Sequence, residues 1–419
     1  MKPLDSTPRR GHGDTTLRCV AVPVVASDIG PVLAQLFALW SDERFAPVVD
    51  ARTHRPHLMI VANAANEDQL ALAEALFRDH PKLANAFSGF SALSADLAGD
   101  FDRYERKPGA REGAYGARAG PNFQFFKTME FSQERGGFTL QIEVDCLPVS
   151  AGWVEATQDV IDDHTSAWVI GSVYAGIGEL KKKTQSHLNG NALYRTGDPL
   201  FQAFLREVWQ PRLMKQIGLD YTVPYDCWWA LECARASARK PNDAWHLFQA
   251  YDPFFHSDPF VVNLLVTTAE VDDYLDVFDR HATLGQAPVF FHGQAMNSVR
   301  ASLLEHPSDG MPQAISRLSG AEVSGSVSGT KIPVTVASGP GWLESLARRY
   351  AEDPTLAASL LRAAAAEMNV NPKNFGAGPL GALDRAVKQL GPDDAVVQYF
   401  RKTEARVVSL GSAEGSSSH

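Results

Sequence analysis

Apolar and amphipathic segments alternate in the N-terminal part of the chain, and this alternation constrains the fold more than any other feature. Residues 17–25 and 57–63 are apolar and rich in β-branched side chains, which is typical of buried strands. Residues 29–40 and 67–78 repeat apolar side chains with helical spacing. The order strand–helix–strand–helix predicts an α/β fold, with a mainly parallel sheet covered by helices on both faces.

Later segments extend the same pattern. We expect helices at residues 122–134 and 199–209, and strands at residues 138–148, 168–174, 261–267 and 288–291. Residues 308–340 are rich in Ser, Gly, Pro and Thr, which predicts a linker or an irregular arm after an α/β domain of residues 17–307. The other expected regions are a disordered N-terminus at 1–16, a helical region at 341–405 and a tail at 406–419.

The composition excludes several classes of protein. The chain has 419 residues, 45% of them apolar, which is ample for a large core. Its net charge of −10 argues against nucleic acid or an anionic membrane surface as a partner. Four cysteines without CxxC spacing indicate reduced thiols, and no apolar run reaches the roughly 20 residues of a membrane span. With a polar, basic N-terminus and no signal peptide, the sequence predicts a cytoplasmic protein without a transmembrane segment.

Two carboxylates end the strand predicted at residues 138–148. Side chains two positions apart share a face of a strand, so Glu143 and Asp145 are expected to point the same way. Carboxylates beside so apolar a strand are costly unless a cation compensates them, and Mg²⁺ or Mn²⁺ bridged to a phosphate-bearing ligand would do so. The alternative is a strand that ends in a solvated turn, because Pro148 is a natural strand terminator.

Several blocks of the chain resemble nucleotide-sugar glycosyltransferases of the GT-A type. They are GPNFQFF at 120–126, IEVDCLP at 142–148, GW at 152–153, VIGSVYAG at 169–176 and HLNGNALY at 187–194. The resemblance covers residues 17–305 and implies a GT-A-like, Rossmann-type sheet. It also implies an acidic motif that holds Mn²⁺ or Mg²⁺ against the diphosphate of a UDP- or GDP-sugar. Because the first acid is Glu143 rather than aspartate, the sequence leaves open whether Glu143 contacts the metal directly or through water, and Asp145 is the main predicted ligand.

A third metal ligand is expected from His292. It follows the apolar residues 289–291, where a late strand would deliver it to the same edge of the sheet, and GT-A enzymes of the resembling type place a histidine there. A hydrogen-bonded structural histidine is the alternative. A mixed set of carboxylates and imidazole favours Mn²⁺.

The resemblance also implies a set of donor-binding residues. The Asn-Gly-Asn block looks like the loop that lines the sugar pocket, the end of the first strand would line the base pocket, and helix N-terminal amides after Gly120 would face an anion. The basic run at 181–183 is either a solvated loop or a lid that meets the diphosphate. The predicted donor-binding residues are Pro23, Val24, Arg118, Asn122, Asn189, Gly190 and Asn191.

An inverting transferase needs a carboxylate that takes the proton of the acceptor hydroxyl. Asp226 and Asp258 are the candidates, and their aromatic neighbours would form a platform for a sugar ring. The alternative is that Trp228 and Trp229 belong to the core while Asp226 caps a helix. A retaining enzyme would need no such base, and the sequence does not decide the stereochemistry.

The sequence therefore predicts a metal-dependent glycosyltransferase that acts on an unidentified acceptor hydroxyl. A metal-dependent hydrolase or nucleotidyltransferase is one alternative, although it would be expected to carry more clustered acids. A non-catalytic nucleotide-sugar-binding module is another. For residues 341–405 the sequence leaves homo-oligomerisation, acceptor docking and packing on the catalytic domain open.

Overall fold

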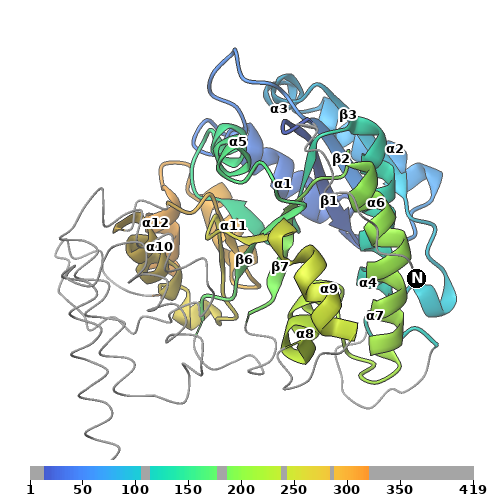
Figure 1. The fold of residues 1–419 in the computed structure, drawn as a ribbon. Coiled ribbons are helices and arrows are strands. Elements are labelled where there is room, and N and C mark those ends of the chain that lie inside the picture. Colours follow the sequence, from blue (N-terminus) through green and yellow to red (C-terminus); the bar gives the residue numbers. More distant parts are fainter. Residues whose placement is uncertain (1–13, 105–113, 177–185, 237–242, 284–286, 320–419) are drawn as a thin grey trace, which may run out of the picture. The chain divides into compact units, whose positions relative to one another are not determined.

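The computed structural model describes residues 14–104, 114–176, 186–236, 243–283 and 287–319 (Figure 1). The chain divides into two units, Met1–Val323 and Ser324–His419, and the second lies outside the described residues. The helical region and the tail predicted from the sequence therefore lie outside the described residues. Within the described part, the first residues of the predicted linker instead form a helix, Met311–Ser319 (α12).

A seven-stranded sheet forms the centre of the first unit. Its strand order is β3-β2-β1-β4-β7-β6-β8, and every pair is parallel except those that β7 makes with β4 and β6. The predicted fold class, α/β with a mainly parallel sheet, is confirmed. The strands of this sheet are β1 (Leu17–Val24), β2 (His57–Ala62), β3 (Gly89–Ser94), β4 (Phe138–Gln141), β6 (Val169–Val173), β7 (Leu188–Tyr194) and β8 (Phe255–Ser257).

Helices connect and cover the strands. A single π-helical turn at Leu205–Trp209 joins α6 to α7. The α-helices before it are α1 (Pro31–Ser41), α2 (Glu67–Arg78), α3 (Pro81–Ala86), α4 (Ala119–Ser132), α5 (Trp153–Asp163) and α6 (Pro199–Phe204). Those after it are α7 (Gln210–Ile217), α8 (Cys227–Ala236), α9 (Asp243–Tyr251), α10 (Asp273–Thr283) and α11 (Met296–Glu305).

Both faces of the large sheet are buried, as the alternation along β1 shows. Val20 and Val22 point into a core formed with α1, α2, α3 and α5. Cys19 and Ala21 point to the opposite face, against α4. Strands buried on both faces appear in the sequence as unbroken apolar runs, which explains why residues 17–25 were recognisable as a strand.

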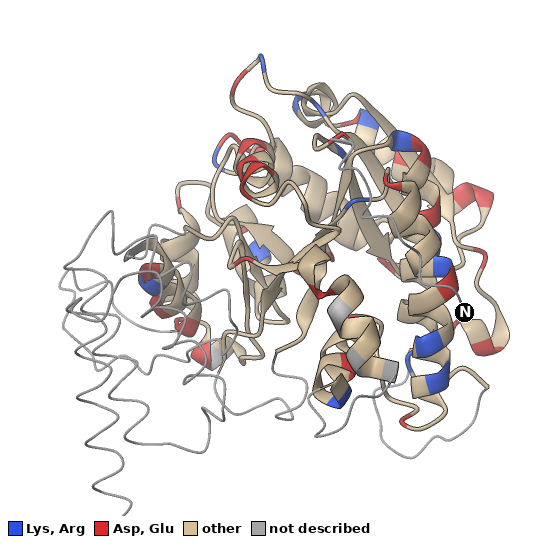
Figure 2. Cartoon of the chain, viewed as in Figure 1, with Lys and Arg blue, Asp and Glu red and all other residues tan. Residues whose placement is uncertain are grey.

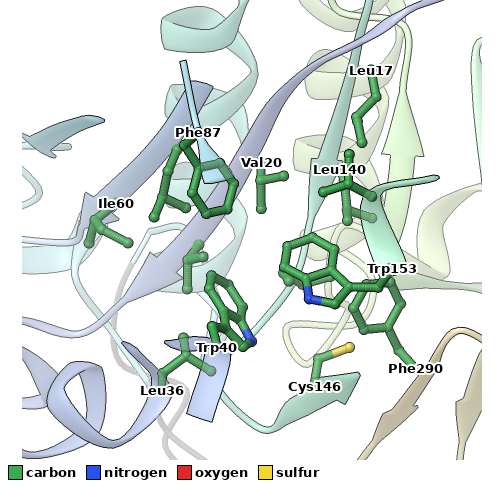
Figure 3. Packing of buried hydrophobic residues seen from close by; sticks show 14 of the residues in the cluster. Leu17, Val20, Leu36, Trp40, Ile60, Phe87, Leu140, Cys146, Trp153 and Phe290 are labelled. Atoms are coloured by element: carbon green, nitrogen blue, oxygen red, sulfur yellow. The ribbon is translucent and has the colours of Figure 1, made fainter. Parts of the chain in front are cut away.

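A second, three-stranded sheet follows the first. It consists of β5 (Cys146–Pro148), β10 (Phe290–His292) and β9 (Val261–Asn263), in that order. The two late strands predicted from the sequence therefore exist but lie in this separate sheet. The large core continues into it, because the Trp153 ring lies 5.1 Å from that of Trp40 and 5.5 Å from that of Phe290 (Figure 3).

Charged residues lie mainly on the helices that cover the sheets, and the strands carry few of them (Figure 2). Glu143 and Asp145, which follow the buried strand β4, therefore differ in position from most other acidic residues of this unit. Among the described residues, no helix is both long and apolar enough to cross a bilayer.

Candidate metal and donor site

The two predicted metal-binding carboxylates lie in a turn and not on a strand. β4 ends at Gln141, and the chain then turns towards the second sheet, with the Cys146 amide donating to the Glu143 carbonyl at 2.9 Å. The expectation that strand alternation aligns Glu143 and Asp145 is therefore wrong. The two carboxylates are brought close together by the turn that leads from the first sheet to the second.

Strand β7 fixes this turn from the side. The Glu143 amide donates to Oδ1 of Asn191 at 2.6 Å, and both the amide and the side chain of Asn191 donate to Oδ1 of Asn189. The Asn-Gly-Asn block was expected to be a loop, but it lies on the antiparallel strand between β4 and β6, with both asparagines buried. Its asparagines position the backbone of the acidic turn.

His292 reaches the same turn from β10, where it is paired with Cys146 of β5. Its Nε2 lies 3.2 Å from Oε2 of Glu143 and 3.5 Å from Oδ1 of Asp145. Its Nδ1 lies 2.9 Å from Oδ1 of Asn263, an amide oxygen that accepts the ring proton. The imidazole is thus oriented with Nε2 towards both carboxylates, and the three predicted metal ligands are brought together.

The charges of the cluster are strongly coupled. Burial disfavours the charged imidazolium, but hydrogen bonds and charges from Asp145 and Glu143 outweigh it and raise the pKa of His292 to about 10. Burial also opposes ionisation of Asp145, but the bond to His292 and its charge hold the pKa of that carboxyl below its usual range. The site is therefore a buried imidazolium between carboxylates, whose proton occupies the position that a cation would take.

The donor set fits a divalent cation. One ligand atom from each of Glu143, Asp145 and His292 lies within 4.8 Å of the other two. Exposure of the side chains rises from 11% at His292 through 23% at Asp145 to 48% at Glu143. The cluster is therefore anchored in the core and open to solvent on one side, where further ligands can reach a bound ion. Two carboxylates and one imidazole are a ligand set typical of a metal centre. The hydrogen bond between Nδ1 of His292 and the side-chain amide of Asn263 is also typical, because it fixes the orientation of the imidazole.

Two residues at this site were missed in the sequence. Asn263 follows the apolar residues of β9 and pairs with His292, so the signal that identified His292, a polar residue after an apolar run, also applied to it. The buried guanidinium of Arg300 donates to the carbonyl of Val144 in the acidic turn, and its charge lowers the pKa of Asp145. Nothing in the sequence around Arg300 distinguishes it from the other residues of a surface helix.

The two predicted bases, Asp226 and Asp258, differ in their hydrogen-bond partners. Asp258 accepts from the Phe260 amide at 3.0 Å and lies 3.0 Å from Nε2 of His164, so its carboxylate already has partners. Asp226 lies 3.6 Å from Nε2 of His187, and its Oδ1 is buried without a hydrogen-bond partner among the described residues. Asp226 stands just before α8, and its Oδ1 makes no capping bond to an amide of that helix among the described residues.

A buried tyrosine connects Asp226 to the acidic turn. Burial and neighbouring Tyr194 raise the pKa of Tyr225, and the negative charges of Asp226 and Glu143 raise it further. The two carboxylates therefore act on the same buried hydroxyl from different segments of the chain. By contrast, no charge from Asp258 contributes to the shifts of these tyrosines.

The hydroxyl of Tyr225 is itself held in a close-packed position. It accepts from Nε2 of Gln141 at 2.7 Å, and its ring stacks on Phe125 at 3.9 Å. A Cβ added to Gly190 would lie 2.0 Å from this hydroxyl. Gly190 is thus required by the packing of Tyr225, and its predicted role as a donor ligand stays a prediction.

The remaining predicted donor residues occupy several environments. Asn122 is fully buried. Its side-chain Nδ2 donates to the Val223 carbonyl and its Oδ1 accepts from the backbone amide of Tyr225, so the side chain supports the segment before Asp226. Pro23 and Val24 end β1 at the edge where β4 also ends. Arg118 is the residue before α4. Burial and the neighbouring Asp226 carboxylate raise the pKa of the Cys227 thiol, and the charge of Arg118 lowers it. The basic run at 181–183 lies outside the described residues.

The aromatic platform predicted next to Asp226 is not available to a sugar. Trp228 is fully buried and Trp229 is 6% exposed. The Trp229 ring stacks on Phe255 at 4.2 Å, and that of Trp228 on Trp209 at 5.3 Å. Both indoles belong to the core between the sheet and helices α6 to α9, as the structural alternative held.

No protein-family model and no curated protein matches the chain. Solved structures to which it is similar include glycosyltransferases. The apo form of mouse xyloside xylosyltransferase 1 is 13% identical, covers 66% of this chain and 97% of its own, and gives a TM-score of 0.39. The galactosyltransferase LgtC, in complex with donor and acceptor sugar analogues, is 11% identical, covers 74% of this chain and 98% of its own, and gives a TM-score of 0.38. A mannosyltransferase from Pyrobaculum calidifontis in complex with GDP-Man and Mn²⁺ is 13% identical, covers 88% of this chain and 90% of its own, and gives a TM-score of 0.29. At such scores the likeness says nothing about activity, which has to follow from the geometry of the site itself.

Proposed function

We propose that this protein is a metal-dependent glycosyltransferase that moves a sugar from a nucleoside-diphosphate sugar to an acceptor hydroxyl. The observation that carries the proposal is the convergence of Glu143, Asp145 and His292 beside the carboxyl ends of β1 and β4. Open α/β sheets bind ligands at this edge. A hard divalent cation on carboxylate and imidazole ligands suits a diphosphate, because the cation can share its remaining positions with phosphate oxygens.

The residues of the site would divide the work as follows. Asp145 and His292 would hold Mn²⁺ or Mg²⁺ directly, and the more exposed Glu143 would do so directly or through water. When bound, the cation supplies positive charge against the diphosphate leaving group. Asn263 would keep Nδ1 of His292 protonated, so that Nε2 could bind the ion, and Asn191 accepts from the Glu143 amide and so keeps the acidic turn in place.

Asp226 is the better candidate for the base. Its buried Oδ1 has no hydrogen-bond partner among the described residues and can accept a proton. Its charge, like that of Glu143, raises the pKa of Tyr225. Asp226 would accept the proton of the acceptor hydroxyl as the oxygen attacks the sugar carbon and the bond from that carbon to the diphosphate breaks. Asp258, which is occupied by His164 and the Phe260 amide, is expected to have no part in this step.

The test is to incubate the full chain with Mn²⁺ and a panel of UDP- and GDP-sugars, and to identify the nucleotide released. Nucleoside diphosphate that appears with one donor, needs the cation and is lost in Asp145→Ala supports the proposal. Release of nucleoside monophosphate and sugar phosphate would identify a hydrolase instead. A metal-dependent thermal shift with a nucleotide sugar but no product would identify a binding module, and either result overturns the proposed function.

A further inference from the structure

A second group of metal-ligating side chains lies outside the Glu143, Asp145 and His292 cluster. It consists of His187, just before β7, and of Asp226 and Cys227, where α8 begins. One ligand atom of each lies within 4.8 Å of the others, and Nε2 of His187 is 3.6 Å from Oδ2 of Asp226. His187 and Cys227 are buried, and the Asp226 side chain is 16% exposed. Two segments of the chain thus bring a nitrogen, an oxygen and a sulfur ligand atom close together.

An unsatisfied atom marks this point as a binding site. Oδ1 of Asp226 is buried and has no hydrogen-bond partner in the described part of the chain. An orphaned carboxylate oxygen away from water is costly, and native proteins satisfy nearly all such atoms with a protein group, a water molecule or an ion. A cation bound by His187 and Cys227 would supply the missing partner.

The identity of the ligand atoms selects the kind of cation. Sulfur is a soft ligand that favours Zn²⁺-like ions, and the set of one cysteine, one histidine and one carboxylate provides three of the four positions of a tetrahedral site. The Glu143, Asp145 and His292 cluster provides only oxygen and nitrogen. The two groups therefore suit different metals.

The segment that carries two of the ligands is positioned before any ion binds. The backbone amide of Tyr225 donates to the buried side chain of Asn122 at 2.7 Å, and the Tyr225 ring is stacked on Phe125. The following residues, Asp226 and Cys227, are therefore held by packing that does not depend on the metal, as a preorganised site requires.

We propose that His187, Asp226 and Cys227 bind one thiophilic divalent cation of the Zn²⁺ class, at a site separate from that of the activating metal. The cation would be four-coordinate, with the fourth position open to water or to an exogenous ligand. Its binding would engage the carboxylate of Asp226, so a Zn²⁺-loaded protein would have no free base at that position; this consequence alone rests on the proposed function.

The test uses Co²⁺ as a spectroscopic substitute for Zn²⁺, with the full-length reduced protein and no sugar donor. A Co²⁺ ion bound to a thiolate gives a sulfur-to-metal charge-transfer band in the near ultraviolet, which carboxylate and imidazole ligands do not give. We expect about one equivalent of Co²⁺ to produce the band and Zn²⁺ to remove it. The absence of any sulfur band in the wild-type protein overturns the proposal, whatever the result of the transferase assay.

Matched variants assign the band to this cluster. Cys227→Ser should abolish it, whereas Cys233→Ser, on the same helix, and Asp145→Ala, at the other cluster, should keep it. A band that persists in Cys227→Ser contradicts the assignment. If Cys227→Ser does not fold, His187→Gln decides: it should weaken Co²⁺ binding by more than about tenfold, and unchanged affinity refutes the site.

Discussion

If the cluster of Glu143, Asp145 and His292 binds Mn²⁺ as proposed, we expect the raised pKa of His292 to make the affinity steeply dependent on pH. The imidazole has its pKa raised from 6.5 to about 10 by Asp145 and Glu143, so it carries a proton near neutral pH. This proton must leave before Nε2 can bind a cation. At about pH 7 the competition should lower the affinity for Mn²⁺ by about a thousandfold relative to the deprotonated site, and each further pH unit should recover about tenfold.

Isothermal titration calorimetry measures both parts of this prediction. Between about pH 6.5 and about pH 8.5 the dissociation constant for Mn²⁺ should fall by about a hundredfold, and two buffers of different ionisation enthalpy should reveal about one proton released per ion bound. Asp145 adds no second proton, because its pKa is lowered and the carboxyl is ionised over this whole range.

The control is His292→Gln, whose side chain does not titrate in this range. Its affinity for Mn²⁺ should be weaker and nearly independent of pH. A wild-type affinity that does not change with pH, or the same dependence in His292→Gln, would refute the coupling between the imidazolium and the metal site. The same raised pKa also stabilises the metal-free fold; this contribution is complete below about pH 6.5 and is lost as the pH rises through about 10.

Three further predictions concern the residues around the site. Asn263→Ala removes the partner of Nδ1 of His292 and should weaken Mn²⁺ binding by about 10- to 100-fold in the same calorimetric titration, and unchanged affinity would show that the amide does not orient the ligand. Asp226→Asn should lower kcat by about 10²- to 10⁴-fold with little change in donor affinity, while the matched variant Asp258→Asn keeps its turnover; the opposite pattern would exchange the two assignments. Gly190→Ala places a Cβ 2.0 Å from the Tyr225 hydroxyl and should destabilise the fold by about 1–3 kcal/mol in denaturant unfolding, whereas an unchanged midpoint would show that the tyrosine moves freely.

The parts of the fold that could be predicted are those with strong local patterns. Strands such as β1 and β2 are buried on both faces, so their sequences are unbroken apolar runs that allow few other structures. The same reasoning failed at Glu143 and Asp145, because alternation assumes that the strand continues, whereas the chain leaves the sheet after Gln141. No local pattern indicates which sheet an apolar segment will join, so the sheet of β5, β10 and β9 could not be foreseen.

The site was predicted to the extent that its residues follow apolar runs. His292 and Asp145 were found in this way, and Asn263 could have been. Arg300 could not, because its role depends on the packing of α11 against the acidic turn. The buried asparagines of β7 show the limit most clearly, because polar residues next to glycine are typical of loops. Their place in a strand depends on backbone pairing with β4 and β6, and Asn191 is used there to accept a hydrogen bond from the Glu143 amide.

The central claim is that Glu143, Asp145 and His292 hold a divalent cation against a nucleoside diphosphate. The most direct measurement is a crystal structure of the full chain with Mn²⁺ and UDP or GDP, with the ion located by its anomalous scattering. The account predicts one Mn²⁺ ion bound by Asp145 and by Nε2 of His292, with phosphate oxygens in its remaining positions. An ion bound elsewhere, or a nucleotide bound without any ion while His292 stays paired with its carboxylates, would contradict it.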